Sequence, residues 1–390
     1  MAVPRRGASA GAGHEWCGSR LTVTDLLLVG AGHTHLYVVR RAAQLAAAGY
    51  RVHLLAPRFF DYSGVASATA AGSLPGDAGR IDVRALAGSS GVHFHEDTLA
   101  SLDPDQRVAV TSTGARIPYD LLSLNLGSVV AAVGLRAHER VLRVKPLSGL
   151  ADLDARIRAA GRPGATVTIV GGGASGLELA AHLSTRSDVA RVHVVESGSV
   201  IGADLPAGAR RRMGRLLAAR GVLVHAGCVV HDLAERHVVC DDGLALSHDV
   251  ALLATGLVAP PLLVELGLGD ERGVPVRGTL QHVDRDEIYA VGDCAHFLPR
   301  PLPRIGVHGV RQGPVLHRSL LARARGGEVP VYEPQDRALS ILDLGDGVGL
   351  AVRGRWWWFG TGPLRLKRYI DRQWLRTYRS STRARAGDAS

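Results

Sequence analysis

Two glycine-rich stretches have the residue types and spacing needed to bind a dinucleotide. In the clearer stretch, Gly171, Gly172, Gly173 and Gly176 form the pattern G-x-G-x-x-G. In such a loop the first glycine permits a tight turn, and the second lets the backbone approach a pyrophosphate. The third allows close packing of a helix on a strand, and the helix N-terminus then faces the anion. We expect these four glycines to bind a dinucleotide.

Two acidic residues follow this loop. Glu196 lies roughly 20 residues past Gly173, at the end of the next apolar segment, which is the spacing of a ribose-binding acid. A carboxylate there accepts hydrogen bonds from a ribose 2′-hydroxyl and repels a 2′-phosphate, so we expect NADH in preference to NADPH. Glu178 lies within the predicted helix; it either positions a nicotinamide ring, relays a proton, or only caps the helix.

The other glycine-rich stretch is less regular. VGAGHTHL (Val29–Leu36) contains Gly30 and Gly32, but His35 occupies the slot of the third glycine. The following apolar segment ends in Ala56 and Pro57, without an acid. By itself this stretch is equally consistent with a nucleotide loop and with an unrelated turn.

The elements that would carry these loops occur twice. A predicted strand precedes each loop and a predicted helix follows it, as at 25–29 and 34–48 in the first unit and at 165–170 in the second. The repeat predicts an α/β fold with two Rossmann-like dinucleotide-binding domains. Short alternating segments at 92–120 and 222–250 predict a β-meander inserted into each domain.

Composition restricts the remaining choices. With 390 residues, 46% of them hydrophobic, the chain can bury more than one core. It lacks an apolar run of about 18 residues, so we expect no membrane span. Residues 1–20 lack an apolar signal core and are expected to form a flexible lead. Cys17, Cys228, Cys240 and Cys294 form no C-x-x-C pair, which argues against a zinc ribbon and a local redox disulfide and suits a reducing compartment. The histidines are scattered, and we expect no metal site.

Several further motifs carry a family resemblance. In chain order these are YDLLSLNLGS, VKPL, ATG, IYAVGDCAHF and GVHGVRQGPVLHRSL. Together with the two glycine loops they resemble the pyridine nucleotide-disulfide oxidoreductase superfamily, flavoproteins with two dinucleotide folds. More narrowly, they resemble the branch of type II NADH dehydrogenases, which includes the flavoprotein half fused to selenide, water dikinase in some bacteria. The resemblance covers residues 22–380.

The resemblance implies a set of cofactor-binding residues. FAD and NADH would be the cofactors, and GHTH would be the usual variant of the FAD loop in this branch. Asp293 would bind the ribityl or phosphate part of FAD, and Gly292 would let the backbone approach. Gln312, expected at the start of the helix after GVHGV, would lie by the flavin pyrimidine edge, and Glu178 near the nicotinamide–flavin contact. The other cofactor-binding residues would be Gly30, Ala31, Gly32, His33, Thr34, Gly127 and Gly256.

The resemblance also divides the chain. We expect a split FAD-binding domain at 21–145 and 258–330, an NAD(H)-binding domain at 146–257, and a C-terminal segment at 331–390. No cysteine pair occurs near the first helix, which argues against disulfide reductase chemistry and indicates an external electron acceptor.

The C-terminal segment ends in a predicted basic helix. Within residues 363–379, Leu366, Ile370, Trp374 and Tyr378 recur at helical spacing, opposite arginines. This stretch contains six basic side chains and a single acidic one, Asp371, so its net charge is strongly positive. Such a helix suits docking to an anionic membrane surface, although it could equally pack on the protein with its basic face in water. Nucleic-acid binding is not expected.

These observations predict an NADH dehydrogenase-like FAD oxidoreductase that passes electrons to an acceptor, with a quinone favoured. Alternatives are a sulfide:quinone reductase, a ferredoxin or rubredoxin reductase, and a low-turnover flavin-binding redox sensor. The expected location is cytoplasmic, or peripheral on the cytoplasmic face of the membrane, and a homodimer stays open.

Overall fold

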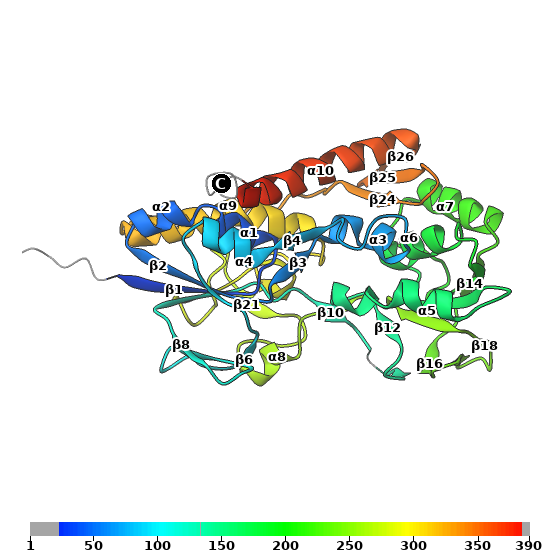
Figure 1. Ribbon diagram of the computed structural model, residues 1–390, viewed down its shortest axis with the longest axis horizontal. Helices are drawn as coiled ribbons and strands as arrows, with labels where there is room; N and C mark the ends of the chain where they lie inside the picture. The colour runs from blue at the N-terminus through cyan, green and yellow to red at the C-terminus, as the bar shows by residue number, and fades with distance from the viewer. Residues whose placement is uncertain (1–22, 133, 384–390) are drawn as a thin grey trace, which may run out of the picture.

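The computed structural model describes residues 23–132 and 134–383, which form two α/β halves lying side by side (Figure 1). The predictions for residues 1–20 and for Cys17 lie outside the described residues. Each half is built around a parallel five-stranded sheet. Two Rossmann-like units, as predicted from the repeated strand–loop–helix pattern, are therefore confirmed.

The first half contains the weaker glycine loop. Its sheet has the order β22-β9-β1-β2-β5, and neighbouring strands are parallel. The strands are β1 (Thr24–Val29), β2 (Tyr50–Leu55), β5 (His93–His95), β9 (Leu121–Leu124) and β22 (Ile288–Ala290).

The second half repeats this plan. Its sheet has the order β12-β19-β13-β14-β15, again all parallel. The strands are β12 (Leu142–Arg143), β13 (Ala165–Val170), β14 (Val189–Glu196), β15 (Leu223–Ala226) and β19 (Val250–Leu253). Because β12 pairs with β19, this sheet already begins before the boundary predicted at residue 146.

Each half also carries a small antiparallel sheet. In the first half β6 (Leu99–Asp103), β7 (Val108–Thr111) and β8 (Arg116–Pro118) form a meander. In the second, β16 (Val230–Leu233), β17 (His237–Cys240) and β18 (Ala245–Ser247) do the same, with β11 (Arg136–Ala137) added beside β16. The predicted meanders were too long at their start, since β5 and β15 belong to the parallel sheets. These two edge strands are short and at least partly exposed, so sequence pattern alone does not separate them from the strands of a meander.

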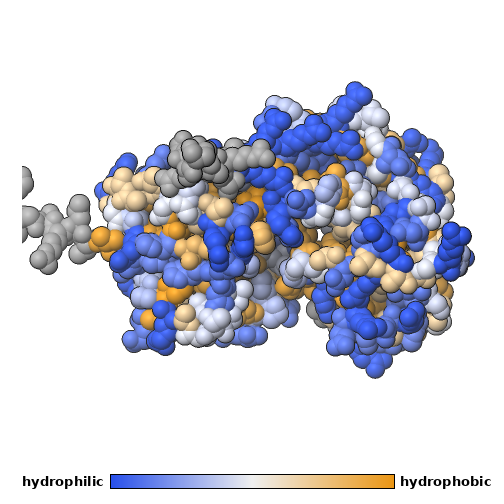
Figure 2. Space-filling view, viewed as in Figure 1, coloured by the Kyte–Doolittle hydropathy of each residue, from blue (hydrophilic) through white to orange (hydrophobic). Residues whose placement is uncertain are grey.

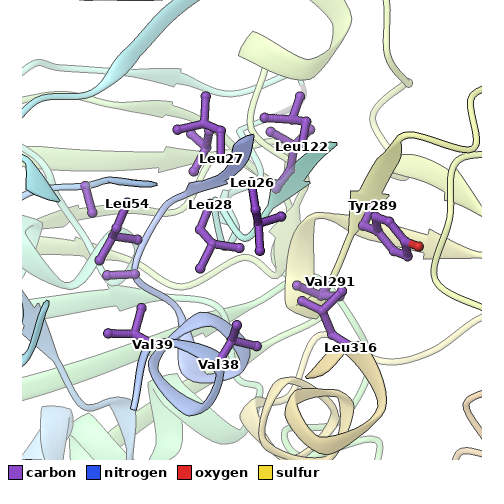
Figure 3. Close-up of a cluster of buried hydrophobic side chains, with 14 of the residues drawn as sticks. Leu26, Leu27, Leu28, Val38, Val39, Leu54, Leu122, Tyr289, Val291 and Leu316 are labelled. Carbon is purple, nitrogen blue, oxygen red and sulfur yellow. The ribbon is translucent and has the colours of Figure 1, made fainter. Parts of the chain in front are cut away.

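Buried aliphatic side chains of β1 form the centre of the first core. Leu26, Leu27 and Leu28 are fully buried. Figure 3 shows them between Leu54 and Leu122 of the adjacent strands, with Val38 below. The predicted helix 34–48 is broken into α1 (His33–Val39) and α2 (Ala42–Ala47), and α1 packs against α9 (Gly306–Ala324). A strand buried on both faces reads as a continuous apolar run, as TDLLLV does.

Short elements complete the two halves. The first half adds β3 (Phe59–Asp61), η1 (Ser63–Val65), α3 (Ala66–Ala70), β4 (Arg80–Asp82), α4 (Val83–Ser89), α8 (Leu262–Glu265), β21 (Val274–Val276), η3 (Gly292–Cys294) and β23 (Ala295–Phe297). The second adds η2 (Leu147–Leu150), α5 (Leu153–Ala159), α6 (Ala174–Leu183) and α7 (Ala207–Ala219). A two-stranded link, β10 (Val129–Val130) with β20 (Leu257–Val258), lies between the two large sheets in the chain.

The C-terminal segment connects the two halves. The antiparallel strands β24 (Ser340–Asp343), β25 (Gly349–Arg353) and β26 (Trp356–Gly360) lead into the long helix α10 (Thr361–Arg383). Leu342 and Leu350 join the core of the second half, whereas Leu375 and Tyr378 of α10 join that of the first. Figure 1 shows α10 running along the face that both halves share.

The side of α10 that packs on the protein differs from the predicted apolar side. Leu366 and Ile370 are exposed, at 37% and 42%, whereas Lys367 and Asp371 are buried. The buried polar pair contacts the η1 loop, and this contact rotates the predicted apolar stripe partly toward solvent.

Candidate functional site

The first glycine loop makes a tight turn against β9. Gly30 has a φ of +88°, and a Cβ there would lie 2.4 Å from the carbonyl oxygen of Asn125. A Cβ on Gly32 would lie 2.4 Å from the Asn125 side chain, which donates to the carbonyl of Val291 at 2.9 Å. Only glycine fits both positions, so the turn from β1 into α1 is held against the neighbouring strand.

His35 replaces the third glycine by linking the loop to the sheet. The side chain is fully buried; its Nδ1 lies 2.6 Å from the Gly30 carbonyl and its Nε2 lies 2.8 Å from the Ser123 hydroxyl. Burial lowers the pKa of His35 to about 4. The imidazole is therefore neutral near pH 7 and holds the glycine turn through two hydrogen bonds instead of by close helix packing.

A cavity of about 460 Å³ opens beside this loop. Besides the glycine turn with Ala31 and His33, it is lined by Gly127, Ser128, Lys145, Gly292 and Asp293. Gly127 has a φ of +73° and no atom within 4 Å of a Cβ position, so its missing side chain leaves open space. Backbone that approaches open space, beside a basic and an acidic side chain, fits the diphosphate and ribityl parts of FAD.

Asp293 lies in the part of the cavity where a ribityl chain is expected. Its Oδ2 accepts a hydrogen bond from the Ser128 hydroxyl at 2.8 Å and lies 3.6 Å from the Lys145 ammonium. Thr34, by contrast, donates its hydroxyl to the Gly309 carbonyl at 2.6 Å and is fully buried. Thr34 thus joins α1 to α9, and its side chain is not available to a ligand.

Gln312 does not lie at the start of a helix, so that prediction is wrong. Helix α9 begins at Gly306, and Gln312 is buried almost two turns later. Its Oε1 accepts a hydrogen bond from the backbone N–H of Gly292 at 2.6 Å. The structure therefore assigns Gln312 to holding the Gly292–Asp293 turn, and Gly306 and His308 begin the helix in its place.

The second glycine loop makes the same turn, but its middle glycine is less crowded than the middle glycine of the first loop. Gly171 has a φ of +114°, and a Cβ would lie 2.3 Å from the Ala254 carbonyl. A Cβ on Gly176 would lie 2.0 Å from the Gly171 carbonyl, which explains the third glycine of the motif. Gly173, at the N-terminus of α6, has open space at its Cβ position. Gly256, with a φ of +102°, also faces open space. The loop fits the pyrophosphate of a dinucleotide.

Glu196 ends β14 directly beside this loop. One carboxylate oxygen accepts from the backbone N–H of Gly172 at 2.6 Å, and the other accepts from that of Gly198 at 2.7 Å. The side chain is thereby held at the carboxyl end of the sheet, where a ribose would lie. At the matching position of the first half, Ala56 follows β2.

Glu178 lies where three parts of the chain meet. Its carboxylate accepts from the Ser67 hydroxyl of α3 and from the backbone N–H of Asp343 in β24, both at 2.7 Å. Desolvation raises the pKa of Glu178, and the nearby Lys367 ammonium opposes that rise. Glu178 therefore joins α6 to both the first half and the C-terminal segment.

A second polar cluster lies between α10 and the η1 loop. The Lys367 ammonium contacts the Gly64 carbonyl and lies 3.0 Å from Asp371, which accepts from the Tyr62 hydroxyl at 2.9 Å. Trp374 stacks on Tyr62 at 4.3 Å between ring centroids and lies 5.0 Å from the His33 ring. Burial and the adjacent carboxylate raise the pKa of Tyr62.

A larger cavity, about 1100 Å³, lies on the α10 side of the η1 loop. It is lined by Gly64, Val65, Ala68, Lys367, Asp371 and Leu375, among others. A third cavity, about 790 Å³, shares Val65 with it and shares Asp61 and Ser148 with the cavity of the first glycine loop. The three cavities therefore meet around residues 61–65.

Comparison with known proteins agrees with this architecture. The family model described as pyridine nucleotide-disulphide oxidoreductase matches residues 24–313. The chain belongs to this family. A rubredoxin-NAD(+) reductase of Alcanivorax borkumensis is 34% identical over 57% of this chain and 57% of its own length. An NADH dehydrogenase-like protein of Mycobacterium tuberculosis is 28% identical over 55% and 58%. The chain thus spans less than two thirds of these relatives.

Solved structures share the fold over nearly the whole chain. NDH2 of Plasmodium falciparum, solved in complex with NADH, has a TM-score of 0.78 at 11% identity and covers 93% of this chain and 99% of its own. The sulfide:quinone oxidoreductase of Aquifex aeolicus has a TM-score of 0.77 at 16% identity, with 94% of each chain covered. The family is one of oxidoreductases, and membership implies FAD and a pyridine nucleotide as the cofactors of the two loops.

One feature of the cysteines was not predicted. Cys228 and Cys240 form a disulfide across the β16–β17 hairpin, with Cα atoms 5.8 Å apart, so the expectation of no local disulfide is wrong. Twelve residues separate the two, and only the hairpin register brings them together. Cys294 is fully buried, and burial raises the pKa of its thiol to about 11. It therefore acts as a small packing residue.

Several residues of the site carried no sequence signal. Asn125, Ser67 and Tyr62 are common residue types, and each gains its role from a partner far along the chain. Lys145 was visible as part of VKPL, but nothing in that motif showed its proximity to Asp293. Among residues 23–132 and 134–383, no helix has both the length and the apolar character needed to cross a bilayer.

Proposed function

We propose that this protein is an NADH:quinone oxidoreductase whose C-terminal segment docks at a membrane surface. The observation that carries the proposal is the cavity of about 1100 Å³ between the η1 loop and α10. It lies across residues 61–65 from the FAD cavity, so an acceptor could approach the flavin without entering the NADH half.

Bound FAD would accept a hydride from NADH and pass electrons to the acceptor. Within the chain, the proposed roles divide between the two halves. Gly30, Gly32 and Asp293 hold the FAD diphosphate and ribityl parts, whereas Gly173 and Glu196 hold the NADH pyrophosphate and ribose. Glu178 would lie near the nicotinamide, where its raised pKa suits holding a proton.

The walls of the large cavity suit a molecule that is reduced and protonated. Buried Lys367 and Asp371 and the partly buried Tyr62 are joined by hydrogen bonds at its edge, and Val65, Ala68 and Leu375 supply apolar surface. A quinone headgroup has two carbonyl oxygens for polar partners and an apolar ring. No cysteine is among the described residues that line this cavity. Because sulfide oxidation needs cysteines beside the flavin, this lining disfavours sulfide as the donor.

The outer face of α10 supports docking at a membrane. Leu366, Tyr369 and Ile370 are 37%, 63% and 42% exposed and lie along one stripe of the helix. Trp356, Trp357 and Trp358 of the adjacent β26 are also exposed. Figure 2 shows a largely hydrophilic surface over α10, and the exposed residues of this helix include Arg365, Arg368 and Arg372. Anionic headgroups would attract the arginines, and the apolar side chains would enter the interface.

One arginine predicted for this surface serves the protein itself. The Arg379 guanidinium donates to the carbonyls of Asp77, Ala78 and Arg80 at 2.8–3.0 Å. The proposed docking face is therefore shorter than residues 363–379 and centres on Leu366–Arg372.

The test combines a quinone assay with vesicle flotation. We expect NADH to reduce a short-chain benzoquinone through the purified flavoprotein, and the protein to float with anionic phosphatidylglycerol vesicles. Ile370→Glu should lower the bound fraction at least about tenfold, since it removes an exposed aliphatic side chain that would enter the membrane interface and adds a negative charge. Its rate with ferricyanide should stay unchanged.

Val264→Glu is the matched control. Val264 is 52% exposed on α8, and the same substitution there should leave flotation unchanged. Equal flotation of the wild type and Ile370→Glu would contradict docking through α10. Quinone reduction absent at every NADH concentration would contradict the quinone assignment.

A second candidate acceptor is a small electron-carrier protein. It is favoured by the 34% identity to a rubredoxin-NAD(+) reductase. An acidic carrier would contact the same arginines of α10, so the two candidates separate by assay. Faster reduction of rubredoxin than of quinone, with no flotation, would favour the carrier.

A further inference from the structure

The two halves fasten their antiparallel meanders in the same place by different chemistry. In the first half, Asp97 lies two residues before β6 and accepts hydrogen bonds from Ser112 and Thr113, which follow β7. In the second half, Cys228 lies two residues before β16 and is bonded to Cys240, the last residue of β17. One fastening is a set of hydrogen bonds, and the other is a covalent bond that a reductant can open.

The covalent fastening is attached to the backbone of the proposed ribose acid. The N–H of Cys228 donates to the carbonyl of Glu196 at 3.0 Å, and the N–H of Gly227 donates to the carbonyl of Gly198 at 2.8 Å. Val195, fully buried, packs against both cysteines. The Gly198 N–H holds the Glu196 carboxylate. The 196–198 turn is thus tied to residues 227–228, which follow β15.

We propose that Cys228–Cys240 is a reversible thiol–disulfide site that sets the affinity for NADH. The proposal rests on the proposed placement of the NADH ribose at Glu196. With the disulfide closed, residues 227–228 hold the 196–198 turn in the conformation that presents the carboxylate. With it open, the hairpin loses a cross-link, and the turn must be ordered when the ligand binds, which weakens binding.

The redox step is a thiol–disulfide exchange. A dithiol reductant attacks one sulfur, the Cys228–Cys240 bond breaks, and a mixed disulfide forms. The second thiol of the reductant then displaces the remaining cysteine. The products are two protein thiols and the oxidised reductant, so two electrons and two protons enter the protein.

Access to the buried sulfurs has a defined route. Cys228 and Cys240 are 3% and 1% exposed, but Cys240 is followed directly by the exposed turn Asp241–Gly243. Opening this turn between β17 and β18 uncovers Cys240 while the parallel sheet stays intact. The site therefore responds to reductant more slowly than an exposed disulfide does.

The experiment measures ligand affinity in the two redox states of the full-length flavoprotein. ADP-ribose is the probe, because it carries the ribose and pyrophosphate but donates no hydride. Calorimetry is run before and after treatment with a phosphine reductant, with a metal chelator present so that freed thiolates and Asp242 bind no metal. Mass spectrometry with a thiol label counts the opened cysteines.

We expect reduction to raise the Kd for ADP-ribose at least about threefold and to leave the flavin content unchanged. The double variant Cys228→Ser/Cys240→Ser should bind like the reduced protein, with or without reductant. Asp97→Ala, which opens the corresponding fastening of the first half, is the matched control and should leave ADP-ribose binding unchanged.

Two results would overturn the inference. Equal Kd values for the oxidised protein and for protein shown to carry two labelled thiols would exclude coupling to the ribose turn. A double variant that binds as tightly as the oxidised protein would do the same. Quinone reduction measured in the same samples tests the proposed function separately, since it can fail while the redox dependence of ADP-ribose binding is present.

Discussion

The two α/β halves share one sheet plan and differ in the residues that stabilise the glycine loop after the central strand. Their parallel sheets have corresponding strand orders, and each has a positive-φ glycine after its central strand. In the first half the third glycine position holds His35, and Ala56 follows the second strand of the unit, where a ribose-binding acid would be expected. In the second half these positions hold Gly176 and Glu196.

This difference separates loop positions that only glycine fits from positions that different residues can fill. The first glycine is required in both halves, because any Cβ would meet a carbonyl of the neighbouring strand. The third position needs only something that fastens the helix to the turn. Close packing does this in one half, and the two hydrogen bonds of His35 do it in the other.

The largest expected effect comes from adding a Cβ to the first glycine of either half. Gly30→Ala and Gly171→Ala should each lower the free energy of unfolding by about 3 kcal/mol, from the clash with a backbone carbonyl and the positive φ. Gly30→Ala should purify without flavin, whereas Gly171→Ala should keep flavin and lose NADH reduction. Urea unfolding and the visible spectrum measure both.

Gly49→Ala is the control for this pair. Gly49 has a φ of +93° but open space at its Cβ position, so it carries the strain without the clash. Loss of flavin in Gly171→Ala and not in Gly30→Ala would reverse the assignment of the two halves.

A smaller effect is expected on the pH dependence of stability, and it arises from His35 in the glycine loop of the first half. Because the folded pKa of His35 is about 4, below its ordinary value, the unfolded chain takes up a proton first as pH falls. The contribution of His35 to the free energy of unfolding is therefore present above about pH 6.5 and is lost as the pH falls toward 4. At pH 5 the loss is about 2 kcal/mol. His35→Gln should therefore lose about 2 kcal/mol less than the wild type between pH 7 and pH 5.

Urea unfolding at the two pH values measures this difference. The exposed His237, replaced by Gln, serves as the control and should keep the wild-type pH dependence. An unchanged pH dependence in His35→Gln would show that the pKa of this imidazole is the same in the folded and the unfolded chain.

The smallest of these effects tests the acid of the second half. Glu196→Ala should weaken NADH by about tenfold, or about 1.4 kcal/mol, and NADPH by less, because the carboxylate favours a 2′-hydroxyl and repels a 2′-phosphate. Steady-state kinetics with ferricyanide and each nucleotide measure the change. The same loss for both nucleotides would refute the ribose role.

The sequence by itself determined the repeated α/β plan and the positions of both glycine loops. Local signals suffice there, because a glycine turn between an apolar strand and a helix is specified by neighbouring residues. The family motifs likewise located Gly292 and Asp293, which line the cavity beside the first glycine loop. By contrast, the pairing of β12 with β19 had no local signal, since β12 has two residues and its partner strand lies far along the chain.

Tertiary structure alone decided the partners of the site residues. Three examples join segments that sequence periodicity treats separately. Glu178 accepts hydrogen bonds from Ser67 and Asp343, Cys228 pairs with Cys240, and Gln312 accepts a hydrogen bond from Gly292. The buried face of α10 was decided in the same way. Its helical period was visible, but the η1 loop offered Tyr62 and a carbonyl to Lys367 and Asp371, and burying that paired charge turned part of the predicted apolar face to solvent.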